Sequence, residues 1–197
     1  MIVIFDNGHG YDTPGKCSPK LPDGRKFYEW KFNRKVVKRL AELCQENGIR
    51  YYVLVPEEND ISLKERVRRI NAIKEECFLF SIHVNASTND GSWGKAKGIS
   101  FFTSKGKTKS DEYATILFNE AKNEFGTEFK LRTDMSDGDP DWEENFYILK
   151  NSICAAVLSE NFFMDNREEC EFLLTDEAVE RIAQIHFRAV KKIMGIK

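Results

Sequence analysis

Short apolar runs alternate along this chain with segments in which apolar residues recur at helical spacing. The runs have the length and composition of buried strands, and they lie at residues 2–5, 51–55, 77–82, 98–103 and 155–158. The segments with apolar residues every three or four positions lie at 36–44, 63–73, 114–125 and 178–193. This alternation predicts an α/β fold in which helices pack on a largely parallel sheet.

Length and composition favour a single domain. The chain has 197 residues, which suits one hydrophobic core, and its 41% hydrophobic and 31% charged residues are an ordinary balance for a globular protein. Neither a repeat nor a linker divides the sequence, so we expect one domain over residues 1–197. Residues 126–145 are acidic and irregular, and residues 147–149 have the pattern of one more short strand.

Charge and hydropathy exclude several kinds of partner. The formal net charge of -2 argues against nucleic acid, because proteins that bind phosphates usually carry a positive excess. No apolar run approaches the roughly 18 residues of a membrane span, so we expect no membrane insertion. Residues 1–5 lack the basic start and long apolar core of a signal peptide, which predicts a product made in the cytoplasm. The five cysteines contain no Cys-x-x-Cys pair and are expected to be reduced.

Polar residues with metal-binding or proton-transfer chemistry stand at the ends of three predicted strands. His9 follows the first run, His83 follows the third, and Glu160 closes the apolar run 155–159. In an open α/β sheet, ligands collect outside the carboxyl ends of the strands, so these side chains are expected to share one crevice. Two imidazoles and a carboxylate suit a catalytic zinc site, in which three protein ligands leave one position for a water whose pKa falls to about 7.

A second carboxylate has to stay off the metal in order to move protons. Glu29, near the start of the first predicted helix, is available beside Glu160. Burial at the end of an apolar run would raise the pKa of Glu160 towards neutrality, as a general base requires. The residues alone do not decide which glutamate is the ligand, and Asp6 and Asp12 are rival ligands close to His9.

Four motifs resemble those of the zinc-dependent N-acetylmuramoyl-L-alanine amidases of cell-wall remodelling enzymes and phage lysins. They are Gly8-His9-Gly10 after the first strand, Glu29 opening the first helix, the block Ser81 to Ala86, and Glu160 with Phe163 and Asn166. The segment Ser62-Leu63 with Arg66, Asn71 and Ala72 resembles another helix of that family. Asn7 and Asn151 depart from the family pattern, in which prolines are usual, and put loop shape and substrate preference in doubt.

The resemblance implies a fold, a site and a reaction. The fold would be a mostly parallel, mixed six-stranded sheet flanked by helices on both faces. His9, Glu29 and His83 would bind one zinc ion, and Glu160 would be the catalytic carboxylate. The reaction would be hydrolysis of the amide between N-acetylmuramic acid and L-alanine in peptidoglycan. We expect a monomer that acts on the cell wall after release or export, as a phage or prophage lysin does.

Other expectations concern the substrate and rival functions. Asn85, Arg66 and Trp93 are expected to contact the substrate, and Trp142 is a further candidate in the acidic segment. His186 lies in the last helical pattern and is expected on the flank of that helix, not at the metal. The alternatives are another zinc hydrolase of the cell wall, such as a deacetylase or carboxypeptidase, or an inactive peptidoglycan-binding module.

Overall fold

The computed structural model describes residues 1–196, which contain six strands and six helices that mostly alternate along the chain. The strands are β1 (Ile2–Asn7), β2 (Tyr51–Val53), β3 (Cys77–Asn85), β4 (Ser100–Thr103), β5 (Trp142–Glu143) and β6 (Ala155–Phe163). The helices are α1 (Glu29–Glu46), α2 (Leu63–Ala72), α3 (Lys109–Phe125), α4 (Tyr147–Asn151), α5 (Arg167–Leu173) and α6 (Asp176–Ile193).

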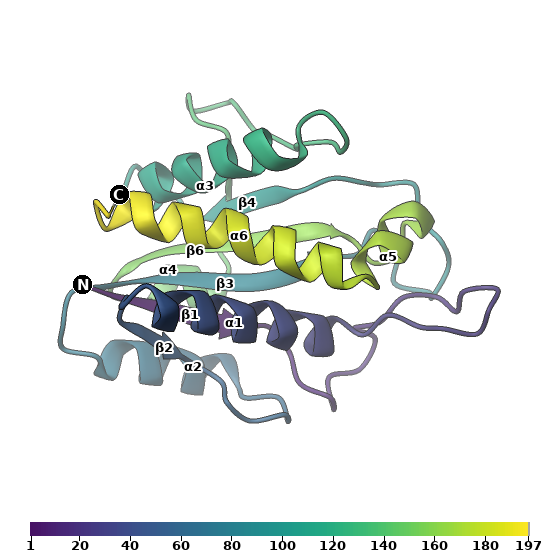
Figure 1. Ribbon diagram of the computed structural model, residues 1–197, viewed down its shortest axis with the longest axis horizontal. Coiled ribbons are helices and arrows are strands. Elements are labelled where there is room, and N and C mark those ends of the chain that lie inside the picture. Colours follow the sequence, from purple (N-terminus) through teal and green to yellow (C-terminus); the bar gives the residue numbers. More distant parts are fainter. Residues whose placement is uncertain (197) are drawn as a thin grey trace.

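All six strands form one sheet in the order β2-β1-β3-β6-β4-β5 (Figure 1). The pairs β1–β2, β1–β3, β3–β6 and β4–β5 are parallel, and only β4–β6 is antiparallel. The expected mixed six-stranded sheet is therefore confirmed. The long central strands β3 and β6 lie side by side, so the residues at their carboxyl ends belong to one region of the molecule.

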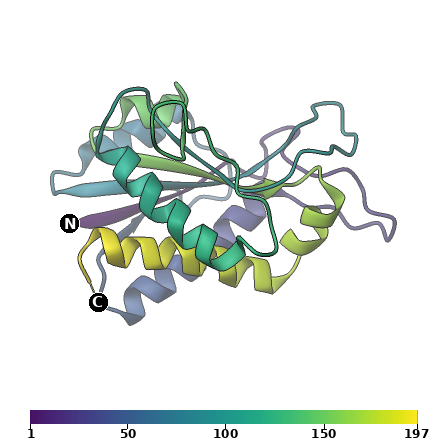
Figure 2. The same ribbon diagram turned by 90° about the horizontal axis from the view of Figure 1, so that it is seen from above.

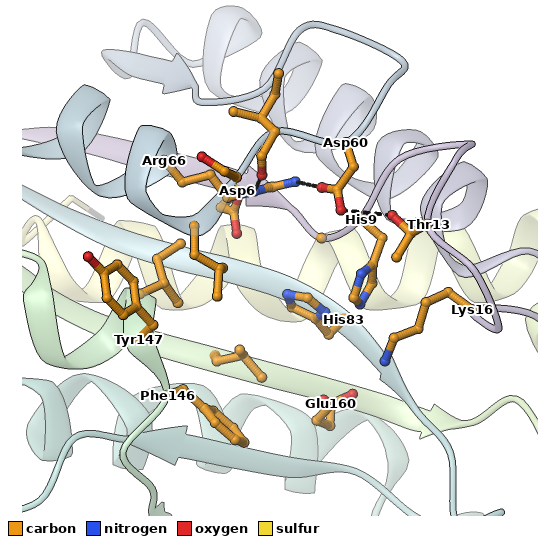
Figure 3. A pocket seen from close by; sticks show the side chains of 16 residues that line it. Asp6, His9, Thr13, Lys16, Asp60, Arg66, His83, Phe146, Tyr147 and Glu160 are labelled. Atoms are coloured by element: carbon orange, nitrogen blue, oxygen red, sulfur yellow. Dashed lines mark hydrogen bonds and ion pairs between the residues drawn. The ribbon is translucent and has the colours of Figure 1, made fainter. Parts of the chain in front are cut away.

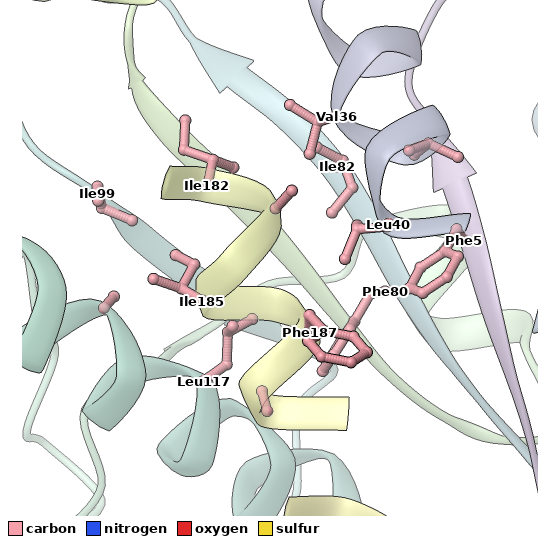
Figure 4. Packing of buried hydrophobic residues seen from close by; sticks show 14 of the residues in the cluster. Phe5, Val36, Leu40, Phe80, Ile82, Ile99, Leu117, Ile182, Ile185 and Phe187 are labelled. Atoms are coloured by element: carbon pink, nitrogen blue, oxygen red, sulfur yellow. The ribbon is translucent and has the colours of Figure 1, made fainter. Parts of the chain in front are cut away.

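Side chains alternate between two apolar layers, one on each face of the sheet. On one face, Phe5, Phe80 and Val157 pack with helices α1, α3 and α6. Figure 4 shows α6 crossing the sheet there, with Ile182 and Ile185 directed towards the strands. On the other face, a smaller cluster joins the strands to α2 and α4. Seen from above, the sheet runs between these two sets of helices (Figure 2).

Local sequence signals set where several helices begin. The Ser62 side chain accepts a hydrogen bond from the Glu65 backbone and starts α2, and Thr175 does the same for α6. Thr108 and Asp111 form a reciprocal capping box at the start of α3. Such caps satisfy backbone N–H groups that have no partner inside the helix.

The segment after the acidic region was wrongly expected to be a strand. Residues 147–149 belong to the short helix α4, in which the Lys150 backbone N–H donates to the Phe146 carbonyl. Both Ile148 and Leu149 are buried against the cluster that also contains α2. Three apolar residues in succession fit a buried strand or one helical turn equally well, and packing against α2 decides for the helix.

Three further differences concern lengths and additional elements. Strands β3 and β6 extend three and five residues beyond the expected ends at Ile82 and Leu158, so His83 and Glu160 lie inside strands rather than after them. Strand β5 falls within the acidic segment, where no strand was expected. Helix α5 was not expected either. None of the helices in residues 1–196 is long and apolar enough to cross a lipid bilayer.

Candidate active site

Three side chains from separate parts of the chain converge at the carboxyl end of the sheet. His9 follows β1, Glu29 is the first residue of α1, and His83 lies near the end of β3. Glu29 Oε1 lies 3.1 Å from His83 Nδ1 and 3.4 Å from His9 Nε2. One potential ligand atom from each residue lies within 4.8 Å of the other two, a spacing that suits a single metal ion.

The glycines beside His9 are required because other groups approach the backbone closely. A Cβ atom on Gly8 would lie 2.1 Å from Cε1 of the His83 ring. A Cβ atom on Gly10 would lie 2.0 Å from the backbone nitrogen of Asp60. The first glycine therefore makes room for the His83 ring, and the second lets the loop before α2 pack against the loop that carries His9.

The His9 backbone is held in an uncommon conformation by its surroundings. Its φ angle is 66°, in the left-handed region that costs free energy for a residue with a side chain. Arg34 Nη1 donates to the His9 carbonyl at 2.8 Å, and the Gly10 N–H donates to Thr13 Oγ1 at 2.9 Å. These hydrogen bonds fix the direction in which the imidazole leaves the chain.

Glu29 is almost completely buried, and within the described chain only one of its two carboxylate oxygens accepts hydrogen bonds. Its relative exposure is 1%, and Oε1 accepts a hydrogen bond from the Val84 backbone at 3.1 Å. Its second oxygen, Oε2, has no hydrogen-bond partner among residues 1–196. A buried carboxylate oxygen without a partner is costly, and a bound cation would remove that cost. The residues present therefore fit a metal ion.

Burial and mutual attraction set the protonation of this group. Burial lowers the pKa of His9 to about 4 despite the opposing charge of Glu29, so its imidazole is neutral near pH 7, as a metal ligand must be. Burial would raise the pKa of Glu29, but the His83 hydrogen bond and the charges of both histidines outweigh it and hold the pKa below its usual range. The pKa of His83 is raised, because Glu29 outweighs the effect of burial.

Glu160 lies beside the three convergent residues and outside the group that could hold a metal. It is the direct register partner of His83 across the β3–β6 pair. Burial raises the pKa of Glu160 to about 7, and its Oε2 has no hydrogen-bond partner among residues 1–196. A carboxylate with these properties can accept and return a proton near neutral pH.

Strand β6 has an irregularity immediately after Glu160. His83 pairs with Glu160 but Asn85 pairs with Phe163, so β6 contains one extra residue at this point. The Asn161 side chain bridges the gap by donating to the His83 carbonyl at 3.0 Å. Glu160 itself stays in register with His83, and the bulge changes the course of β6 beyond it.

The site opens into a cavity of about 430 Å³ (Figure 3). One wall comes from α4 and the start of α2 and is largely apolar, with Leu63, Phe146 and Tyr147. On another side, the loop after His9 contributes Thr13 and Lys16. The cavity therefore has an apolar wall and a cationic one, with the histidines and Glu160 between them.

The structure separates the expected ligands from their rivals. Asp6 accepts hydrogen bonds from Ser81 and Arg66, and Asp12 accepts from the Asp60 backbone, so neither belongs to the convergent group. His186 is completely buried, not on the helix flank as expected. Its ring contacts Ser159 Oγ at 2.9 Å and the Ile182 carbonyl at 2.8 Å.

The expected substrate contacts are more scattered. Arg66 borders the cavity but is only 2% exposed, and its guanidinium donates to Asp6, Asp60 and two backbone carbonyls. Asn85 and Trp93 do not line the cavity, and the Asn85 side chain accepts from the backbone of the next residue. Trp142, in β5, lies with its ring tilted against that of Phe102 in the neighbouring strand β4.

Sequence reasoning missed Lys16, Thr13 and the aromatic residues of α4. Thr13 links two loops, since its hydroxyl donates to Asp60 at 2.9 Å. Only their position in the sequence could have indicated Thr13 and Lys16, which lie in the glycine- and proline-containing loop between His9 and Glu29. No periodicity marks such loop residues.

Comparisons with known proteins agree on one family. Residues 2–192 match the family model described as N-acetylmuramoyl-L-alanine amidase. An endolysin of Bacillus phage SPP1 is 27% identical over 202 residues, covering 100% of this chain and 67% of the endolysin. The crystal structure of an N-acetylmuramoyl-L-alanine amidase from Clostridium difficile 630 superposes with a TM-score of 0.80 at 25% identity, covering 100% of this chain and 97% of that one. The catalytic domain of CwlV from Bacillus (Paenibacillus) polymyxa var. colistinus has a TM-score of 0.79 at 21% identity, with 100% and 99% covered.

Proposed function

Because the chain belongs to the N-acetylmuramoyl-L-alanine amidase family, we propose that it hydrolyses peptidoglycan with one zinc ion held by His9, Glu29 and His83. The observation that carries this proposal is the convergence of two imidazoles and a buried carboxylate with an unpartnered oxygen. The set leaves a coordination position for water or substrate, as catalytic zinc sites do. When bound, zinc supplies polarisation of the scissile carbonyl and lowers the pKa of the attacking water.

Glu160 is the proton-transfer group in this proposal. Its pKa near 7 lets it accept a proton from the attacking water and pass it to the leaving amine of L-alanine. Glu29 is unsuited to that step: burial would raise its pKa, but the His83 hydrogen bond and the charges of both histidines hold that pKa below its usual range. This assigns the two glutamates different roles, which the sequence alone left open.

The residues around Glu160 and the metal ligands fix them in place. The Asn161 amide ties the β6 bulge to the His83 carbonyl, and Arg34 holds the carbonyl of His9. Arg66 forms no hydrogen bond or ion pair with the proposed ligands. It forms ion pairs with Asp6, in β1, and with Asp60, in the loop before α2. We therefore assign Arg66 a positioning role in place of the substrate contact expected from sequence. Asn85 and Trp93 remain predictions as substrate contacts.

The substrate is peptidoglycan, and we propose that the protein acts on the cell wall as a lysin. The similarity to a phage endolysin supports this setting. The monomeric state remains a prediction, which sedimentation at several protein concentrations would test.

A digest of purified peptidoglycan tests the reaction and separates the alternatives. An amidase releases the free amine of L-alanine and leaves the glycan chain intact. A deacetylase would release acetate, a carboxypeptidase would release a C-terminal amino acid, and a binding module would release nothing. Absence of new L-alanine amines with zinc-loaded protein would contradict the proposal.

A further inference from the structure

Lys16 brings a positive charge into the active-site cavity. Its side chain is half-buried, and its ammonium group points to the space between the two histidines and Glu160 (Figure 3). Its charge acts on His9, Glu29 and Glu160 alike. Within residues 1–196, Lys16 forms no ion pair and its side chain makes no hydrogen bond.

The backbone of Lys16 is fixed directly beside the proposed metal ligand. Its carbonyl accepts a hydrogen bond from the Glu29 N–H at 3.1 Å. The next residue, Cys17, forms a β-bridge with Tyr28, the residue before α1. The lysine side chain therefore starts from an anchored point beside the site, whereas Lys20, further along the same loop, has an exposed side chain and does not line the cavity.

An anion bound next to Lys16 would stabilise its positive charge. Partial burial removes part of its hydration, and a divalent cation at the neighbouring site would repel it. No carboxylate of the described chain neutralises it through an ion pair. The missing anion would then come from the substrate.

Two parts of a peptidoglycan stem could supply negative charge. One is the scissile carbonyl oxygen, which gains charge only during reaction, and the other is a permanent carboxylate on the peptide. A metal ion bound at the site would stabilise the charge that develops on the scissile carbonyl oxygen. Lys16 lies across the cavity from Tyr147 (Figure 3), so the cavity has one side suited to apolar or sugar surface and one suited to an anion.

We propose that Lys16 binds a free carboxylate on the stem peptide within two residues of the scissile amide. An extended peptide advances about 3.5 Å per residue, so such a group lies within reach of a lysine beside the site. The enzyme thereby favours stems whose second residue carries a free acid over stems in which that acid is amidated. This inference rests on the proposed function and names its substrate preference.

The test compares two substrates that differ in one group. Muramyl-L-alanyl-D-glutamate and its isoglutamine form, each with the γ-carboxyl blocked as a methylamide, have the same shape, but only the first has a free carboxylate on the second residue. Hydrolysis is measured with the zinc-loaded protein and with Lys16→Met, Lys16→Arg and Lys20→Met. Binding of the product dipeptides L-Ala-D-Glu and L-Ala-D-isoglutamine, blocked at the γ-carboxyl in the same way, is measured by calorimetry in parallel. Zinc content and thermal unfolding verify that each variant is folded and loaded.

The native protein should favour the free acid by about 10- to 100-fold in kcat/KM, the range of a charge-assisted hydrogen bond. Lys16→Met should lose that preference, while Lys16→Arg and Lys20→Met keep it. Equal use of both substrates by the native protein would overturn the inference. So would an equal slowing of both substrates in Lys16→Met, which would assign the lysine to the scissile carbonyl. If neither substrate were cleaved, the proposed function would fail, and the dipeptide binding preference would still decide the role of Lys16.

Discussion

His83 and Glu160 are direct register partners on the parallel strands β3 and β6. The pairing brings the proposed metal ligand and the proposed proton-transfer group together through the regular hydrogen-bonding of the sheet, although 76 residues separate them in sequence. Rigid strands hold such pairs more exactly than loops do, which favours catalysis. His9 and Lys16 lie in a loop instead, and hydrogen bonds from side chains and backbone hold that loop in place.

The two glutamates should respond differently to the same substitution. Glu160→Gln should retain zinc but hydrolyse peptidoglycan roughly 10²- to 10⁴-fold more slowly, because the amide cannot accept the proton. Glu29→Gln should weaken zinc binding, since a neutral amide oxygen is a poorer donor than a carboxylate. Zinc titration of each apo variant, followed by an assay at saturation, measures both effects. Loss of metal in Glu160→Gln with retention in Glu29→Gln would reverse the assigned roles.

The histidines should divide cleanly into ligands and a structural residue. His9→Ala and His83→Ala should each lose most of the bound zinc, measured by elemental analysis after gel filtration. His186→Gln should keep it, because His186 contacts Ser159 and Ile182 in the core and no metal ligand. An empty site in a folded His186→Gln protein would show that the ligand assignment is wrong.

Gly8 should be necessary for metal affinity rather than for folding. A methyl group there would lie 2.1 Å from the His83 ring, so Gly8→Ala should displace the imidazole and weaken zinc binding at least about tenfold. Gly48→Ala is the matched control, because that glycine has a φ of 65° and its added methyl meets open space. The control should lose about 1 kcal/mol of stability and no zinc affinity. Equal zinc binding by Gly8→Ala and native protein would count against the proposed His83 geometry.

Asp141 should make the stability of the fold depend on pH. It is 2% exposed, and burial together with Asp139 raises its pKa to about 8. The unfolded chain ionises near its ordinary value of 3.8, so between that value and about 8 the folded state binds more protons. Stability contributed by this group therefore falls as pH rises through that window.

The substitution Asp141→Asn removes this dependence. The variant should exceed the native protein in free energy of unfolding by a larger margin at pH 8 than at pH 5. Urea denaturation at both pH values measures the margin. A margin that shrinks as pH rises would contradict the assigned protonation of Asp141.

Much of the candidate site could be predicted from the positions at which polar residues end the apolar strand patterns. His9, His83 and Glu160 were identifiable because parallel strands bring their carboxyl ends to one edge of the sheet. Glu29 depended on family resemblance, since a carboxylate at a helix start is common for electrostatic reasons alone. Lys16 could not be predicted, because a loop has no periodicity and the proposed role of Lys16 depends on a backbone contact with Glu29.

The errors in the fold also have physical causes. Residues 147–149 pack as a helix because α2 offers an apolar surface, which no local pattern in that segment reveals. β5 has only two residues, Trp142 and Glu143, too few for an alternating pattern to be visible. Arg66 was expected at the substrate, but its partners Asp6 and Asp60 lie 60 and 6 residues away, and their convergence is a tertiary effect.

The central claim is that hydrolysis depends on one metal ion bound at His9, Glu29 and His83. Its most direct test is to titrate zinc into metal-free protein while measuring the free amine of L-alanine released from peptidoglycan. We predict no release without metal and a rise that reaches its plateau at about one zinc per chain. His83→Ala should remain inactive at the same zinc concentration. Full release of L-alanine amines by demonstrably metal-free protein would contradict the account.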